Sequence, residues 1–250
     1  MSLPESRFEP PPATLDAARR WLAPVRAALG AEFLAAYVTG SALTEGFDPA
    51  RSNLNLLVVV RALPPSALDP LAAAIPPPGR GPHVAPLFLG REQLRDSLDV
   101  FPIEWLDLLE RHLLLEGEDV LAGVEVPRTY LRLQCEQELR GKHLRLRQEY
   151  LGAAGHPQRL REALVRLASG FHTLFRTLLR LQGETPPART ERVIERLADV
   201  YHLDATALLG AHLLRVAPRP HAADETRDLY RRFLTEIERL VAAIDGLRVS

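Results

Sequence analysis

The sequence predicts an α+β protein in which a small mixed-sheet domain is followed by an all-α helical bundle domain. In the first half, short apolar segments alternate with helical segments and proline-rich loops, a pattern typical of a small mixed sheet. In the second half, apolar residues recur at helical spacing. We place the domains at residues 1–125 and 126–250.

The first domain is expected to begin with a helix, a strand, a polar turn and a second strand. Thr14 can cap the helix, Gly30 can end it, and Pro24 should kink it. The segment "FLAAYV" then forms a strand that ends at Gly40. After the turn, "LNLLVVV" at residues 54–60 is so continuously apolar that both of its faces should be buried.

The rest of the first domain continues with a short helix at residues 64–75, which two prolines begin. The following "PPPGRGP" is a loop, because neither a helix nor a central strand tolerates this composition. Residues 83–89, "HVAPLFL", form a third strand. We expect residues 91–121 to be mostly helical, with a break at Pro102.

The second domain contains three long apolar stripes at helical spacing, with shorter helices expected at residues 189–200 and 205–214. The stripes consist of Leu131, Cys135, Leu139, Leu146 and Tyr150; of Leu160, Leu164, Leu167, Phe171, Leu174, Phe175 and Leu178; and of Leu229, Phe233, Ile237, Leu240 and Ile244.

A motif joins the first two strands. The first strand ends in Gly40 and Ser41, the turn contains Gly46, and Ser52 comes shortly before the second apolar strand. This arrangement resembles the nucleotidyltransferase superfamily, which includes DNA polymerase beta and the kanamycin nucleotidyltransferases. Glycine allows a backbone to approach a triphosphate, and a serine hydroxyl with nearby amides can bind phosphate oxygens. The resemblance therefore implies a nucleotidyltransferase-like first domain with these four residues on the phosphates.

The acidic part of the family motif is absent. The family has two aspartates, two residues apart, which project from one face of the strand and hold two magnesium ions. Here Asn53 and Asn55 take their places, and they are the only asparagines in the chain. The third family carboxylate lies on a later strand, and residues 83–89 contain none.

An amide keeps the shape of a carboxylate but removes the charge that Mg²⁺ requires. We therefore expect no metal site, no cofactor and no functioning catalytic residue. Magnesium would bind only if other acids, such as Glu45 or Asp48, had taken over. The leading hypothesis is a degenerate, catalytically inactive nucleotidyltransferase-like protein that senses a nucleoside triphosphate or binds a protein partner. An active metal-dependent enzyme with relocated ligands, acting on a small molecule or a protein, is the alternative.

Basic residues outnumber acidic ones between residues 128 and 180. Arg132, Arg140 and Arg147 can share one helix face, flanked by Lys142 and Arg145, and could contact RNA or the phosphates of a nucleotide. The helical half would then be an RNA-contacting module. The competing interpretation is a solvated face held by ion pairs such as Glu136 with Arg140.

Composition sets limits on the whole chain. With 31 basic and 32 acidic residues, no global charge recruits nucleic acid or a membrane surface. Cys135 is the only cysteine, so disulfide frameworks and cysteine-built zinc sites are excluded. No signal core or membrane-length apolar run occurs, and we expect a cytoplasmic protein. Residues 97–121 resemble the segment that follows the catalytic sheet in bacterial nucleotidyltransferase-like proteins, which implies a bacterial-type protein. Arginine dominates over Lys142, the single lysine, which fits either a GC-rich genome or a heat-adapted host.

Overall fold

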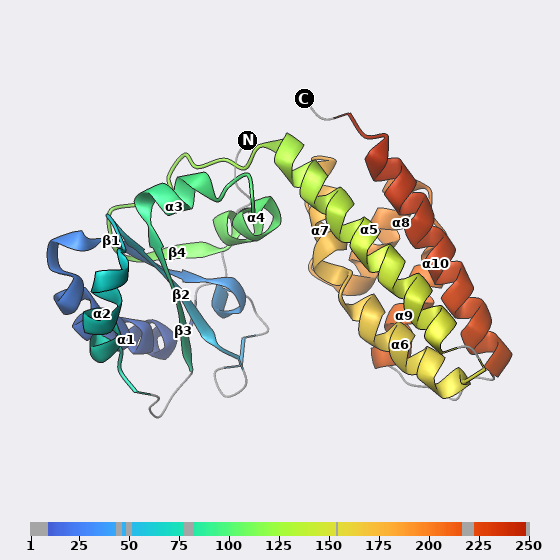
Figure 1. The fold of residues 1–250 in the computed structure, drawn as a ribbon, viewed down its shortest axis with the longest axis horizontal. Coiled ribbons are helices and arrows are strands. Elements are labelled where there is room, and N and C mark those ends of the chain that lie inside the picture. The colour runs from blue at the N-terminus through green and yellow to red at the C-terminus, as the bar shows by residue number, and fades with distance from the viewer. Residues whose placement is uncertain are drawn as a thin grey trace. The chain divides into compact units, whose positions relative to one another are not determined.

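The computed structural model describes residues 10–43, 47–48, 52–77, 83–153, 155–216 and 223–248. The chain divides into two compact units, Met1–Val126 and Pro127–Ser250 (Figure 1). Unit 1 contains a four-stranded sheet, and the described residues of unit 2 form helices and connecting turns without a strand. The predicted fold class, a small mixed sheet followed by an all-α part, is confirmed.

The sheet of unit 1 has the strand order β3-β2-β1-β4. Its strands are β1 (Phe33–Thr39), β2 (Leu54–Val60), β3 (Val84–Gly90) and β4 (His112–Gly117). The central strand β1 pairs antiparallel with both β2 and β4, whereas β2 and β3 are parallel. The sheet is therefore mixed, and β1 and β2 are flanked on both sides.

Helices cover both faces of this sheet (Figure 1). On one face, α1 (Pro12–Leu29) and α2 (Leu68–Ala74) pack against the even-numbered residues of β2. On the other face, α3 (Arg91–Asp96) and α4 (Pro102–Glu110) pack against Leu57 and Val59 of the same strand. Because successive strand residues point to opposite faces, β2 contributes to both cores, as its continuous apolarity predicted. Short 3-10 helices occur at Gly30–Glu32, Gly40–Leu43 and Pro65–Ala67.

The prediction that residues 91–121 are mostly helical was wrong for β4. The break at Pro102 is present, and this proline begins α4. Residues His112–Gly117, however, form a strand on the free edge of β1. A segment with three consecutive leucines does not distinguish helix from strand by periodicity, so long-range pairing with β1 determined the outcome. Gly117 ends the strand with φ +97°. A Cβ on this residue would lie 2.2 Å from the Leu34 carbonyl oxygen, so a side chain does not fit there.

The opposite edge of the sheet is formed by β3, which contains Pro86. The amide of Leu54 in β2 donates to the carbonyl of His83, just before β3, at 2.8 Å. Because backbone groups alternate in direction along a strand, the odd-numbered residues of β3 direct their N–H and C=O groups toward β2. Pro86 consequently faces the free edge. A residue without an N–H is tolerated there because no ladder hydrogen bond is lost.

Unit 2 is built from six helices in its described residues, and none of the described helices of the chain is long and apolar enough to cross a membrane. Most residues of the predicted stripes are buried in its core, with Leu146, Phe171 and Phe233 fully buried, whereas Tyr150, Leu167 and Leu229 are only partly buried. The second stripe is split at Gly170 into two helices, although its apolar residues continue on both sides of the break. The helices are α5 (Arg128–Gly152), α6 (Pro157–Ser169), α7 (His172–Leu181), α8 (Thr190–Tyr201), α9 (Ala205–Val216) and α10 (Ala223–Asp245).

Candidate functional site

A row of four residues crosses the sheet of unit 1 where β1 ends. Thr39 pairs with Asn55 on one side and with His112 on the other, and Asn55 pairs with Ala85. Paired residues in neighbouring strands project from the same face of a sheet. This sheet-end row, Ala85, Asn55, Thr39 and His112, therefore offers an amide, a hydroxyl and an imidazole, and no carboxylate.

Gly40 and Asn55 lie close together. Gly40 has φ +72°, and its amide donates to the Arg111 carbonyl at 3.3 Å. A Cβ at this position would lie 3.1 Å from Nδ2 of Asn55, so the turn backbone approaches the amide side chain closely. The structure thus brings the first residue of the predicted phosphate-binding turn next to Asn55, one of the two asparagines of the sequence motif.

The other predicted phosphate-binding residues flank this pair. Ser41 is exposed in the 3-10 helix Gly40–Leu43. Ser52 is partly buried, and its amide donates to the Asp48 carbonyl at 2.8 Å. Asn53, next in the chain, is exposed. Gly46 and Glu45 lie outside the described residues.

The acids near the sheet end do not assemble into a metal site. Asp107, at the end of α4, forms an ion pair with Arg111 four residues later. Asp48 is exposed in the turn. Within the described part of the chain, no group of three or more His, Cys, Asp or Glu side chains is arranged to hold a metal ion. Because Mg²⁺ prefers anionic oxygens, the amide, hydroxyl and imidazole of the sheet-end row do not fit it.

His112 of this row contacts Tyr37, which belongs to the core on the same face of the sheet. The rings of His112 and Tyr37 pack edge to face with their centroids 5.6 Å apart. Nδ1 of His112 lies 2.8 Å from the Leu109 carbonyl oxygen. Tyr37 is fully buried and donates to Asp119 at 3.0 Å. Burial raises the pKa of this phenol to about 12, so it stays protonated at neutral pH.

The predicted basic stripe on α5 is largely neutralised within unit 2. Arg132 donates to Glu136 at 2.9 Å and to the Ile244 carbonyl at 3.1 Å, and Arg140 binds Glu136 at 2.8 Å and Asp245 at 2.9 Å. Hydrogen bonds from Arg140, and then from Arg132, lower the pKa of Glu136. Two of the three predicted basic contacts thus fix α5 to the end of α10, and the ion-pair interpretation of this face holds for them.

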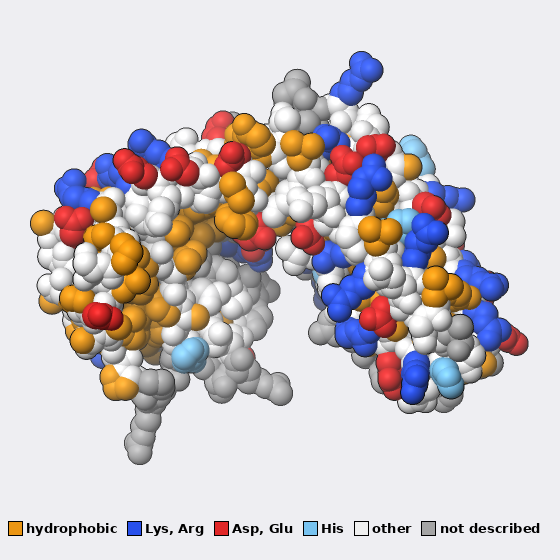
Figure 2. Space-filling view, viewed as in Figure 1, with side chains coloured by type: hydrophobic (Ala, Val, Ile, Leu, Met, Phe, Trp, Pro, Cys, Tyr) orange, Lys and Arg blue, Asp and Glu red, His pale blue; other side chains and the backbone are white. Residues whose placement is uncertain are grey.

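Arg147 differs from these two arginines. It is exposed, and its charge is a minor contributor to the lowered pKa of His143, which burial chiefly causes. Over the visible face of unit 2, basic side chains are interspersed with acidic ones (Figure 2). No continuous basic face of the kind that binds a nucleic-acid backbone is formed by the three predicted arginines.

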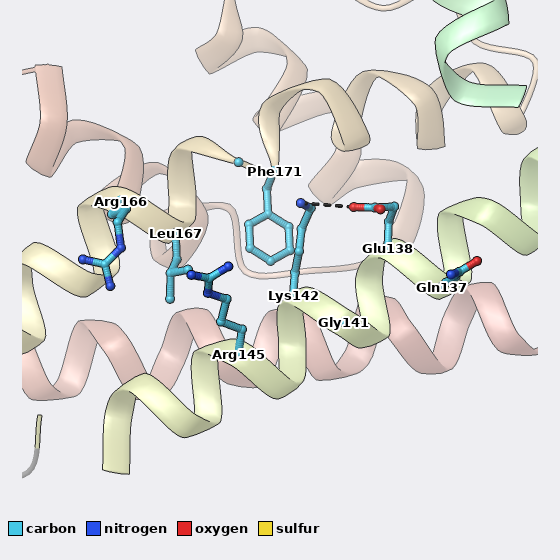
Figure 3. A pocket seen from close by; sticks show the side chains of 9 residues that line it. Gln137, Glu138, Gly141, Lys142, Arg145, Arg166, Leu167 and Phe171 are labelled. Carbon is cyan, nitrogen blue, oxygen red and sulfur yellow. Dashed lines mark ion pairs between the residues drawn. The ribbon is translucent and has the colours of Figure 1, made fainter. Parts of the chain in front are cut away.

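Two features of unit 2 were not predicted. Lys142 and Arg145, expected only to flank the stripe, line a cavity of about 620 Å³ together with Arg166 (Figure 3). Separately, His212 is 7% exposed, with its ring nitrogens 3.2 Å from Nε2 of His172 and 3.1 Å from Glu191. Both features join residues from different helices, so spacing within one helix did not reveal them.

Comparisons with known proteins give similarities to solved structures. No family model matches the chain, and no curated protein matches it. One similar structure is the spectinomycin adenyltransferase AAD(9) from Enterococcus faecialis with ATP and spectinomycin, at 12% identity and a TM-score of 0.47, covering 90% of this chain and 98% of that one. Another is a nucleotidyltransferase-like protein from Exiguobacterium sibiricum, at 16% identity and a TM-score of 0.43, covering 92% of this chain and 74% of that one.

Proposed function

We propose that this protein is a nucleotidyltransferase-like protein that no longer transfers nucleotides and instead senses a nucleoside triphosphate through its retained turn. The observation that carries the proposal is the sheet-end row. Asn55 lies in the middle of this row next to Gly40, and the row contains no carboxylate. The backbone approach that suits a phosphate is retained, whereas the charge that suits a metal ion is lost.

The loss of charge decides against ordinary catalysis. Nucleotidyl transfer with two metal ions needs anionic ligands to hold them and to offset their charge. Removing one contributor to transition-state electrostatics commonly costs about two to three orders of magnitude in rate. All three family carboxylate positions lack an acid here: Asn53, Asn55 and the third strand, residues 83–89.

A thermal-shift and calorimetric titration of the whole chain with nucleoside triphosphates, each with and without Mg²⁺ or Mn²⁺, tests this proposal. A ligand that binds only the folded state raises the melting temperature, so modest affinity is detectable. We expect saturable binding that does not require the metal and that weakens in Ser41→Ala. In parallel, a labelled-nucleotide transfer assay should give no product.

The variant Asn53→Asp/Asn55→Asp sharpens the experiment. Restoring two carboxylates should make triphosphate binding depend on Mg²⁺, whereas Asn53→Gln/Asn55→Gln, which adds no charge, should not. Metal-dependent transfer by the natural chain, abolished by Ser41→Ala, would refute the proposal. Loss of that transfer in Glu45→Gln or Asp48→Asn would then identify an active enzyme with relocated ligands.

A protein partner remains the second candidate ligand. The observation that favours it is apolar exposure on unit 1: Val100 and Phe101, between α3 and α4, are 57% and 52% exposed. Absence of any triphosphate binding, together with retained folding, would favour this role over nucleotide sensing. RNA binding through Arg132 and Arg140 is disfavoured, because both are already held by Glu136.

A further inference from the structure

Unit 2 contains a basic cavity of about 620 Å³ between α5 and the turn that joins α6 to α7 (Figure 3). This volume lies within the range of about 300–1,000 Å³ that is usual for small-molecule sites. The cavity is formed by unit 2 alone. Its lining consists of Gln137, Glu138, Gly141, Lys142 and Arg145 from α5, Arg166 and Leu167 from α6, and Gly170 and Phe171 from the turn.

Positive charge dominates the lining. Three cationic side chains face one acidic side chain, Glu138, which forms an ion pair with Lys142 at 3.2 Å. Arg166 pairs with Glu149, outside the lining, at 2.9 Å. Arg145 has no ion pair among the described residues. Arg132 and Arg140 of the same helix, by contrast, are both paired with Glu136.

The three cationic side chains of the lining come from two helices. Figure 3 shows Lys142 and Arg145 extending from α5 toward the segment that carries Leu167 and Phe171, with Arg166 on the far side of Leu167. Like charges that line one cavity repel each other, and an anion between them removes that repulsion. Guanidinium groups from two helices can then bind one phosphate through charge-assisted hydrogen bonds.

Two glycines line the cavity, Gly141 on α5 and Gly170 in the turn. A Cβ on Gly141 would have no neighbour within 4 Å, so the α5 wall is bare at that turn of the helix. A Cβ on Gly170 would lie 3.9 Å from Nζ of Lys142, so the opposite wall comes close to the ammonium group. The fully buried Phe171 also belongs to the lining. A ligand can therefore approach the α5 backbone at Gly141, beside Lys142 and Arg145 of the same helix, with Arg166 contributed by α6.

We propose that this basic cavity binds a phosphorylated small molecule, with Arg145, Arg166 and Lys142 on the phosphate oxygens. The ligand class follows from the excess of positive charge, the two guanidinium groups and the volume. The proposal does not depend on the sheet-end site, because the cavity belongs to unit 2 and holds whether or not unit 1 binds a triphosphate.

Calorimetric titration of the whole chain with inorganic pyrophosphate at low salt tests the proposal. A hydrogen bond between charged groups contributes about 1.5–3 kcal/mol, so Arg145→Gln should weaken binding about tenfold or more. Arg159→Gln is the matched control, because Arg159 is an exposed arginine of α6 outside the lining and its loss changes the net charge equally. We expect this control to change the affinity less than twofold.

A second variant should act in the opposite direction. Glu138→Gln removes the only acid of the lining and releases Lys142, so pyrophosphate should bind more tightly. Equal weakening by Arg145→Gln and Arg159→Gln would show diffuse electrostatic attraction and overturn the proposal. Undetectable pyrophosphate binding by the natural chain would also overturn it, as would Arg145-dependent binding of single-stranded RNA without pyrophosphate binding.

Discussion

Replacing Gly40 by alanine tests how the turn and Asn55 are held together. Two costs add at this position. The left-handed backbone, φ +72°, costs an L-residue about 1–2 kcal/mol. The new Cβ would lie 3.1 Å from Nδ2 of Asn55, and turning that side chain off its rotamer costs about 0.5–1.5 kcal/mol more. The expected loss in free energy of unfolding is therefore about 1.5–3.5 kcal/mol, the sum of these two contributions.

Gly123→Ala separates the two costs. Gly123 is in the same unit and has φ +76°, but a Cβ there would have no neighbour within 4 Å. Its replacement should cost only the backbone contribution. The difference between the two variants, measured by urea denaturation of the whole chain, isolates the contact with Asn55.

A double-mutant cycle completes this test. In an Asn55→Ala background the amide is absent, so Gly40→Ala should cost no more than Gly123→Ala. Equal losses for Gly40→Ala and Gly123→Ala in the natural background would refute the close approach. An excess that persists without the Asn55 side chain would refute its assignment to that residue.

Two further predictions concern polar groups elsewhere. Hydrogen bonding from Arg232 lowers the pKa of Asp204 from 3.8 to about 2. The Asp204 carboxylate therefore stabilises the folded state above pH 4, and this stabilisation is lost as the pH falls toward 2. The melting temperature should drop less over that interval in Asp204→Asn than in the natural chain, and identical pH profiles would contradict the assignment. The hydroxyl of the fully buried Tyr37 donates to Asp119 and accepts from the Leu121 amide. Tyr37→Phe should therefore lower the free energy of unfolding, measured by urea denaturation, by about 1–2 kcal/mol. An unchanged denaturation midpoint would contradict this prediction.

Local patterns predicted most elements of this fold, and tertiary pairing determined the rest. Apolar continuity located β2, and Pro102 marked the start of α4. Residues 112–117 were misassigned because a short apolar segment becomes a strand only when an unpaired edge, here that of β1, is available. The break at Gly170 was missed because Leu167 and Phe171 continue the apolar stripe across it.

The part of the candidate site that comes from the sequence motif itself was predictable. Spacing identified Gly40 and Asn55, but only the strand register shows that Thr39, His112 and Ala85 share their row. Ion pairing of Arg140 with Asp245 joins residues more than 100 positions apart, which helical periodicity cannot foresee. The basic cavity depends in the same way on how α6 and α7 pack against α5.

The proline on the outer strand limits how other proteins can associate with this sheet. An incoming strand needs a continuous series of donors and acceptors along the edge it joins, and Pro86 interrupts that series in the middle of β3. Polymerisation by strand addition is thereby discouraged at this edge, even though Leu87 beside it is 51% exposed. Any partner that docks on this side of unit 1 must recognise side chains rather than extend the sheet.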